Sequence, residues 1–343
     1  MSFDLSLSAA EAFLPEAPPS NPAFYGSTHA RSRDSVRWTP TNHILSTTAH
    51  NEIRLLGPSG DIGELKDVSE IRSSEPIYAC EPCPILTEYE NAVFLYSARE
   101  HHIQLRNAYD PEMGLVASYR YTNPTTEAFM SPRSLCFTPD GFHFLAGAKN
   151  EIALFDLKDQ FNPVSTYVTG GRNRSMHMGG LPTGVRGLVT AIACQEQTFA
   201  IGTFERHVGL YDMRSMGPIV NFTLDVPSRQ ETNGRGVSQI KWSPCGNFLY
   251  LAERCSDGIC VMDVRSGGQL ISWLAGRRAG TMMRLEFDVV PTSDGHEVWA
   301  GGVDGKLRVW SNPHRGTGSQ TFSSTCQMFE DNGKILPMGC RQH

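Results

Sequence analysis

The sequence predicts an all-β fold, a WD-repeat β-propeller, from three features that recur together along the chain. The first is a strand-like run of alternating aliphatic residues that often ends in aspartate, as in residues 152–157 (IALFDL). The second is its period, because six such runs start 50, 49, 56, 51 and 48 residues apart. The third is a turn ahead of most runs, such as Thr138-Pro139-Asp140-Gly141. A repeated unit of this kind indicates propeller blades.

Each repeat supplies four strand-like segments. In the third repeat these are 135–137, 144–147, 152–157 and 164–168, and the turn at 138–141 joins the first two. Proline presets φ and glycine tolerates a positive φ, so the turn connects adjacent antiparallel strands. The side chains that we expect in the core include Leu154, Phe155, Leu210, Val261 and Trp310.

Six repeats can be drawn in full, and the closure of the ring is the open question. The repeats cover about 33–70, 76–120, 131–168, 186–224, 235–274 and 281–323. Beyond Ser323 the only apolar pair is Ile335-Leu336, which is too little for a whole blade. An open ring exposes unpaired strand edges. We therefore expect seven blades with a degenerate or incomplete last blade, and the alternative is a ring with a gap. The rival fold is a β-sandwich with coincidental spacing.

The repeats divide the chain into three parts. Residues 1–30 are rich in proline and lack periodicity, which predicts a largely disordered segment. Residues 31–323 form the predicted propeller. Residues 324–343 form a short C-terminal tail, which either stands alone or completes a ragged closing blade.

Composition limits the classes of function. No apolar stretch approaches the roughly 20 residues that span a bilayer, and no Lys or Arg precedes Arg31, so we expect neither a membrane anchor nor a targeting peptide. Nine cysteines without a pairing pattern indicate a reducing compartment. The net charge of −6 means that any contact with nucleic acid depends on a local basic patch.

Basic residues gather on one predicted face of the ring. In a four-stranded meander, the fourth-to-first and second-to-third connections emerge on the same face. The longest predicted connections, 120–132, 169–187, 225–236 and 275–281, are all of the first kind. The cations that these two sets of loops carry are Arg99, His101, His102, Arg120, Lys149, Arg172, Arg174, Arg186, Arg206, His207, Arg229, Arg235, Arg254, Arg277 and Arg278. A solvated polar rim explains any one of them, whereas their common face favours an anionic partner.

Several segments resemble a known family. They are Pro76–Cys80 (PIYAC), Tyr96–Ile103 (YSAREHHI), Asn107–Tyr109 (NAY), Tyr119–Tyr121 (YRY), Ser134–Gly141 (SLCFTPDG) and Phe204–Tyr211 (FERHVGLY). In this order the chain resembles the telomerase Cajal body protein family of WD-repeat proteins and its fungal splicing-associated relatives. The resemblance covers about 33–312, and the stretch from Ser97 through Tyr109 is its most distinctive part.

The resemblance implies a nuclear, non-enzymatic adaptor for RNA–protein particles. Animal members bind small Cajal-body RNAs and telomerase RNA, and fungal members are associated with small nuclear RNPs and pre-mRNA splicing. The implied partners of this chain are therefore a small nuclear or Cajal-body type RNA and its RNP proteins. We expect a monomer that acts within a larger complex.

The sequence favours particular residues for RNA. We expect Arg99, Arg172, Arg174, Arg186 and Arg206 to contact phosphates, since the arginine fork suits them and the glycines around Arg172 permit a flexible loop. Phosphate contacts position RNA without reading its sequence. The expected base-stacking side chains are Tyr121 and His102.

Metal and enzyme sites are not predicted. Cys80 and Cys83 have the spacing of half a zinc site, but no second cysteine pair completes it, and His101 and His102 fall at the other end of that blade. The sequence contains no nucleophile elbow, phosphate loop or zinc-protease motif. We therefore expect no metal, no cofactor and no catalytic residues.

An alternative function rests on strand ends. Asp156, Asp212 and Asp263 are expected to cap strands. Asp212-Met213-Arg214 and Asp263-Val264-Arg265 also resemble the Asp-x-Arg boxes of substrate receptors for cullin-RING ubiquitin ligases, in which the arginine projects toward the ligase adaptor. Simple turn residues are the bland interpretation of both boxes.

Overall fold

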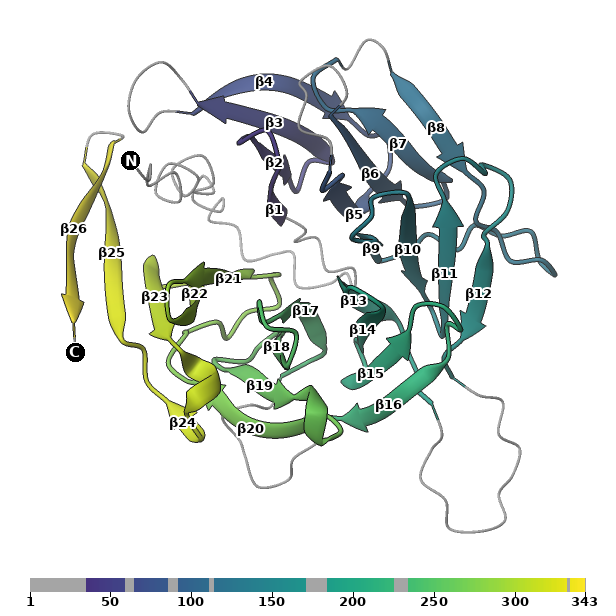
Figure 1. Ribbon diagram of the computed structural model, residues 1–343. Helices are drawn as coiled ribbons and strands as arrows, with labels where there is room; N and C mark the ends of the chain where they lie inside the picture. Colours follow the sequence, from purple (N-terminus) through teal and green to yellow (C-terminus); the bar gives the residue numbers. More distant parts are fainter. Residues whose placement is uncertain are drawn as a thin grey trace, which may run out of the picture.

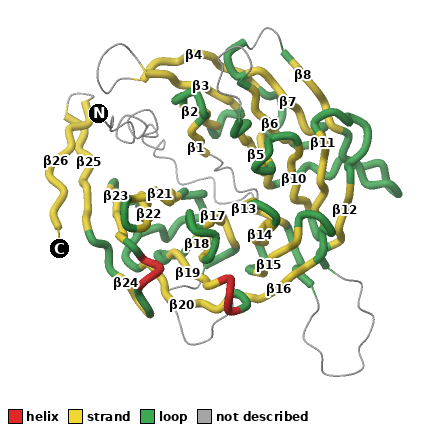
Figure 2. The backbone as a smooth tube through the Cα atoms, viewed as in Figure 1, coloured by secondary structure: helices red, strands yellow, loops and turns green. Residues whose placement is uncertain are grey.

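The computed structural model describes residues 35–58, 65–85, 92–110, 114–170, 184–224, 234–331 and 334–342. Within them the chain forms β-strands and two short 3-10 segments, η3 (Val264–Ser266) and η4 (Pro313–Arg315). Figure 2 shows how completely strands and loops make up the ring. The predicted all-β propeller is confirmed.

Six sheets stand around a central axis, and in each the first strand lies nearest the centre (Figure 1). The first sheet contains β1 (Ser35–Trp38), β2 (Ile44–Thr47), β3 (Glu52–Pro58) and β4 (Leu65–Arg72). The second contains β5 (Ile77–Pro82), β6 (Val93–Ala98), β7 (Ile103–Asn107) and β8 (Leu115–Tyr119). The third contains β9 (Ser134–Phe137), β10 (His143–Ala148), β11 (Glu151–Asp156) and β12 (Ser165–Val168).

The remaining three sheets follow the same antiparallel plan. The fourth contains β13 (Val189–Gln195), β14 (Thr198–Thr203), β15 (His207–Asp212) and β16 (Pro218–Thr223). The fifth contains β17 (Val237–Trp242), β18 (Phe248–Glu253), β19 (Ile259–Asp263) and β20 (Gln269–Leu274), with β24 (Gly318–Gln320) added at its edge. The sixth contains β21 (Phe287–Thr292), β22 (Gly295–Gly301), β23 (Lys306–Ser311), β25 (Ser324–Asp331) and β26 (Lys334–Gln342).

The turn between β9 and β10 shows why the sequence folds this way locally. The Thr138 hydroxyl donates to Asp140 at 2.5 Å, and the backbone N–H of Phe142 donates to the same carboxylate at 3.0 Å. Gly141 has φ of +68°, which lets the chain reverse without strain. The turn sets the register in which Phe137 lies opposite Phe144.

Apolar side chains fill the spaces between successive sheets. A separate buried cluster joins each of the five neighbouring pairs from the first sheet to the sixth. Between the second and third sheets, for example, the Tyr119 and Phe144 rings meet edge to face at 5.0 Å. Of the predicted core residues, Phe155, Leu210, Val261 and Trp310 are buried, whereas Leu154 is only partly buried at the edge of its cluster.

The seam between the sixth and first sheets is different, and we call it the closing seam. Among the described residues no apolar cluster joins these two sheets. Instead, Glu286 accepts a hydrogen bond from the backbone N–H of Val36 at 3.4 Å and forms an ion pair with Arg37 at 3.1 Å. A cavity of about 730 Å³ lies here, and its walls include Trp38, Trp299 and Leu307.

The predicted seventh blade is not confirmed, since the described residues form six sheets. The segment after Ser323 contributes β25 and β26 to the sixth sheet, so β25 is the fourth strand of that blade. The last part of the sixth predicted repeat, residues 312–323, instead contains β24, which pairs in parallel with β20 of the fifth sheet. This short Gly-Ser-Gln strand has no apolar alternation to reveal it, and it covers an edge that would otherwise be unpaired.

Candidate functional site

One face of the ring carries the longer loops, and we call it the long-loop face. Its described parts are the connections between sheets (73–76, 120–133, 169–170, 184–188, 224, 234–236 and 275–286) and the turns between the second and third strands of each sheet. Backbone hydrogen bonds tie the two sets together, as from Arg99 to Pro76 at 3.0 Å and from Asn150 to Gly187 at 2.8 Å. Arg172, Arg174, Arg229 and much of the connections that bear them lie outside the described residues.

Arg206 is a structural clamp. It lies in the turn between β14 and β15, where its Nε and Nη2 donate to the two carboxylate oxygens of Glu253 at 2.7 and 3.0 Å. Nη2 also donates to the carbonyl of Leu224 at 3.2 Å. The Arg206 side chain is only 15% exposed, and that of Glu253 is 1% exposed. The guanidinium therefore ties the fourth sheet to the fifth, and its donors already have partners in place of a phosphate.

Arg99 and Tyr121 are also held within the fold. Arg99 is half exposed, and its Nη2 lies 2.7 Å from a carboxylate oxygen of Glu75. Tyr121 is 3% exposed, and its hydroxyl donates to Glu151 at 2.8 Å. Burial, and then the Glu151 carboxylate, raise the pKa of Tyr121. The expectation that Tyr121 stacks on a base conflicts with this position, because its ring has no free face.

His102 has a different aromatic neighbour. Its ring meets the ring of Phe129 edge to face, with centroids 5.0 Å apart, and Phe129 is 41% exposed. Burial, and then the charges of Arg120 and His101, lower the pKa of His102 and favour its neutral form. The sequence analysis missed Phe129, which sits in a loop without periodicity. Its only signal was its place in a long insertion on the face already singled out.

Lys149 and Arg186 form an exposed basic pair between the third and fourth sheets. Residue 149 pairs with Leu188 in an isolated antiparallel bridge, and both cationic side chains are exposed. Among the described residues neither has an ion-pair partner. The Asn150 side chain accepts a hydrogen bond from the Gly187 N–H at 2.6 Å, which fixes the loop beneath Arg186. These cations remain available to an anion.

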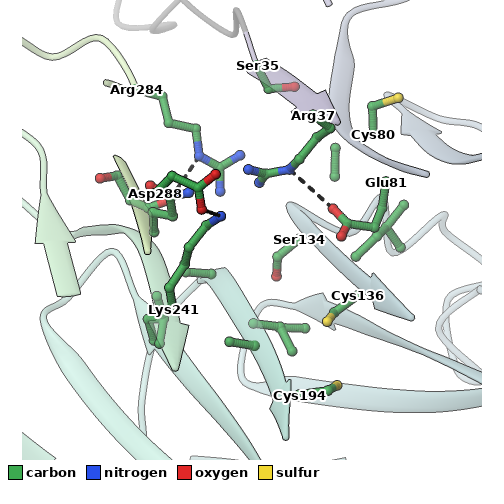
Figure 3. Close-up of a pocket in the computed structure, with 18 of the residues that line it drawn as sticks. Ser35, Arg37, Cys80, Glu81, Ser134, Cys136, Cys194, Lys241, Arg284 and Asp288 are labelled. Atoms are coloured by element: carbon green, nitrogen blue, oxygen red, sulfur yellow. Dashed lines mark hydrogen bonds and ion pairs between the residues drawn. The ribbon is translucent and has the colours of Figure 1, made fainter. Parts of the chain in front are cut away.

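The central channel is the other candidate site (Figure 3). It is a cavity of about 410 Å³ lined by the innermost strands. Its charged groups are largely paired with one another. The Nζ of Lys241 lies 2.5 Å from Oδ1 of Asp288, and the Nε of Arg37 lies 3.3 Å from Oε2 of Glu81. Burial, and then the charge of Glu286, raise the pKa of Glu81, against the opposing effect of Arg37.

Arg284 joins three sheets across the channel. Preceding β21, it donates to the carbonyls of Ser238 in the fifth sheet and Thr190 in the fourth, at 2.9 and 2.5 Å. Burial lowers the pKa of Arg284 to about 10, so it stays charged at neutral pH. No histidine is among the described residues that line the channel. These groups support the ring and form no recognisable nucleophile–base pair.

Comparisons with known proteins bear on what this face and channel serve. No protein-family model matches the sequence. Guanine nucleotide-binding protein negative regulator 1 of Schizosaccharomyces pombe is 31% identical over 229 residues, which cover 66% of this chain and 54% of that protein. Human Telomerase Cajal body protein 1 is 23% identical over 288 residues, 80% of this chain and 48% of that protein. The chain is similar in sequence to Telomerase Cajal body protein 1.

The fungal side of the resemblance is present as well. Protein SWT21 of Candida glabrata is 23% identical over 222 residues, which cover 61% of this chain and 49% of that protein. The resemblance stated from the sequence is thus confirmed. The chain spans about half the length of the curated relatives that it matches.

The opposite face of the propeller carries the strand-end aspartates. Asp156 accepts from the N–H of Lys158 at 2.9 Å, and Asp212 accepts from the N–H and hydroxyl of Ser215 at 2.8 and 2.7 Å. Asp263 accepts from the N–H of Arg265 at 2.9 Å and opens η3. The hydrogen bonds to Ser215 lower the pKa of Asp212.

The arginines of the two Asp-x-Arg boxes turn back onto the propeller. Arg265 donates to both oxygens of Asp263, at 3.0 and 2.8 Å, and its guanidinium lies 5.3 Å from the Phe248 ring centroid. Arg214 donates to the Gln197 side chain at 3.2 Å. The ligase interpretation expects each arginine to project toward a partner, whereas both guanidinium groups bond to side chains of the propeller itself.

The cysteines and histidines of the described residues form no group of three or more metal-binding side chains. Cys80 and Cys83 are both buried, and burial raises the pKa of Cys80. No helix in the described part of the chain is long and apolar enough to cross a membrane.

Proposed function

We propose that this protein is a nuclear, non-enzymatic WD-repeat adaptor that holds a single-stranded segment of a small nuclear or Cajal-body type RNA on its long-loop face. The observation that carries the proposal is the pair Lys149 and Arg186, which are both exposed and have no ion-pair partner among the described residues. In the sequence, Arg186 comes shortly after Arg172 and Arg174. The names of the relatives, Telomerase Cajal body protein 1 among them, support an RNP and a nuclear location.

The physical chemistry favours a small footprint. The chain has a net charge of −6, so attraction to RNA has to come from a few local cations. Of the predicted phosphate contacts, Arg186 is exposed and has no ion-pair partner among the described residues, Arg99 forms an ion pair with Glu75, and Arg206 forms an ion pair with Glu253. Affinity then rests on Arg186 and Lys149, together with the predicted contacts Arg172 and Arg174, which lie outside the described residues. Such contacts position RNA, and base contacts must add selectivity.

The deciding experiment is ultraviolet cross-linking of the native protein, followed by purification under denaturing conditions and sequencing of the attached RNA. We expect enrichment of small nuclear or Cajal-body type RNAs over a mock purification. The variant with Lys149→Ala and Arg186→Ala should lose most of this RNA while keeping the wild-type melting temperature. Cross-linked RNA indistinguishable from the mock sample would contradict direct RNA binding.

The Schizosaccharomyces pombe relative supports a second candidate, because its name describes a negative regulator of a guanine nucleotide-binding protein. In that case the same face binds a protein. Mass spectrometry of a native, uncross-linked purification separates the candidates: RNP proteins support the adaptor, whereas a guanine nucleotide-binding protein supports the regulator. Cullin-ligase subunits would instead revive docking through the Asp-x-Arg boxes.

A further inference from the structure

We infer that Phe129, positioned by His102 and flanked by Arg120, is a stacking platform for one unpaired RNA base at the rim of the long-loop face. The inference rests on the proposed function, since it names the part of the RNA that this site takes. Unpaired bases are recognised by stacking on aromatic rings and by nearby arginine planes.

The platform belongs to a small hairpin with a fixed shape. Thr122 and Phe129 pair in an antiparallel bridge, and the N–H of Met130 donates to the carbonyl of Tyr121 at 3.1 Å. The Asn123 side chain accepts from the N–H groups of Thr125 and Thr126, which closes the loop at its tip. The hairpin thus presents Phe129 at a defined position.

The hairpin is also anchored to the second sheet. The Ser97 hydroxyl donates to the carbonyl of Pro132 at 2.6 Å, and the Glu100 N–H donates to the Ser131 hydroxyl at 3.0 Å. The edge-to-face contact of His102 with Phe129 adds a third tie on the same turn. A ring held this way loses little further freedom when a ligand binds, which favours affinity.

Side chains in the segment 119–121 alternate between the buried core and the exposed side on which Phe129 lies. Tyr119 and Tyr121 are buried, with 0% and 3% exposure, and they pack on Phe155. Arg120, between them, faces outward and is exposed. Phe129 is exposed on the partner strand of the hairpin. The outward side of this segment therefore combines a cation with an aromatic ring.

A base fits this site better than a phosphate. The carboxylates of Glu100 and Glu127 are exposed close by in sequence and would repel a phosphate. A neutral base meets no such repulsion, and the burial that lowers the pKa of His102 favours the neutral form of that ring. The phosphates of the same RNA segment then lie over Lys149 and Arg186, at the next boundary, between the third and fourth sheets.

The test compares binding of single-stranded poly(A) and poly(U) to the full chain. Phe129→Ala should weaken poly(A) binding roughly 5- to 150-fold, the range for one lost base–aromatic stack. Phe129→Ala should also reduce the preference for poly(A) over poly(U), because the larger base stacks more strongly. Phe129→Trp, which keeps an aromatic ring at this position, should retain the wild-type preference. The salt dependence should stay at its wild-type slope, because no phosphate contact is lost. The matched control is Phe142→Ala, a 59% exposed ring in the β9–β10 turn of the other face.

The outcomes are distinguishable. If the wild-type chain binds neither RNA, the proposed function fails. If it binds RNA and Phe129→Ala binds both polymers as the wild type does, only the platform is overturned. Equal losses in Phe129→Ala and Phe142→Ala, or a changed salt slope in Phe129→Ala, also overturn it. Fluorescence melting of each variant shows that the propeller is folded.

Discussion

Arg206 and Glu253 form a two-pronged ion pair in which the Nε–Oε1 and Nη2–Oε2 distances are 2.7 and 3.0 Å, across the boundary between the fourth and fifth sheets. The carboxylate is almost fully buried, and Arg206 and the N–H of Gly234, at 3.3 Å, both stabilise its charge. The contact makes Arg206 a determinant of stability.

Removal of Arg206 should therefore act through Glu253. Arg206→Ala leaves a buried carboxylate without its arginine partner, and we expect a loss of about 3–5 kcal/mol in the free energy of unfolding. Arg206→Ala combined with Glu253→Ala should be less damaging than the sum of the single changes, because the residual charge is gone. Urea unfolding of the four proteins measures this. A loss of RNA affinity in Arg206→Ala with unchanged stability would contradict the structural role.

The basic pair makes a quantitative prediction about salt. Replacing Lys149 and Arg186 together by Ala should flatten the plot of log binding constant against log salt by about 1.4, at about 0.7 per phosphate on single strands. The control removes two charges from the opposite face, through Arg214→Ala and Arg265→Ala, and should leave the slope unchanged. Equal flattening by both pairs would mean that RNA responds only to net charge.

The thiols should differ in reactivity. Cys245 is exposed, and although partial burial opposes the shift, the hydrogen bond with Ser243 and others with Asn247 lower its pKa. A hydrogen bond with Cys136, and then burial, raise the pKa of Cys194, which lines the channel. Because the thiolate is the nucleophile, iodoacetamide at neutral pH should label Cys245 before Cys194. Peptide mass spectrometry over time reads the order, and early labelling of Cys194 would argue that the channel opens.

A buried histidine should make stability fall in mild acid. His296 is 2% exposed, and its Nε2 lies 2.7 Å from the hydroxyl of Tyr250. Burial, and then the charges of His314 and Arg315, lower the pKa of His296 to about 4. The unfolded chain therefore takes up this proton first, so the stability is fully present above about pH 6.5 and declines as the pH falls toward 4.

Comparison with His296→Phe isolates this contribution. The variant has no proton to take up at this site, so its free energy of unfolding should change less between pH 7 and pH 5 than that of the wild type. Urea unfolding at the two values measures the difference. The same drop in both proteins would assign the acid sensitivity to other groups.

The repeat predicted the strands well because each uses local signals. The alternation in 152–157 and the turn at Thr138–Gly141 are complete within a few residues, and the strands formed there. The functional site was harder to predict from the sequence, because the role of each side chain depends on contacts with residues far along the chain. Arg206 and Arg186 look alike in sequence, yet only Arg206 meets a buried carboxylate, 47 residues away. Tyr121 likewise alternates with Arg120, and only packing shows which of the two faces inward.

Because of the closing seam, the boundaries between neighbouring sheets are not held by the same kind of contact all around the ring. Five of its inter-sheet boundaries are held by burial of apolar surface, whereas the described contacts across the sixth are charged and polar, at Arg37 and Glu286. Added sulfate screens ionic contacts and strengthens apolar ones, so it changes the stability of these two kinds of boundary in opposite directions. Partial opening of the ring should therefore begin at the closing seam, where the first sheet separates from the sixth while the other five boundaries stay closed.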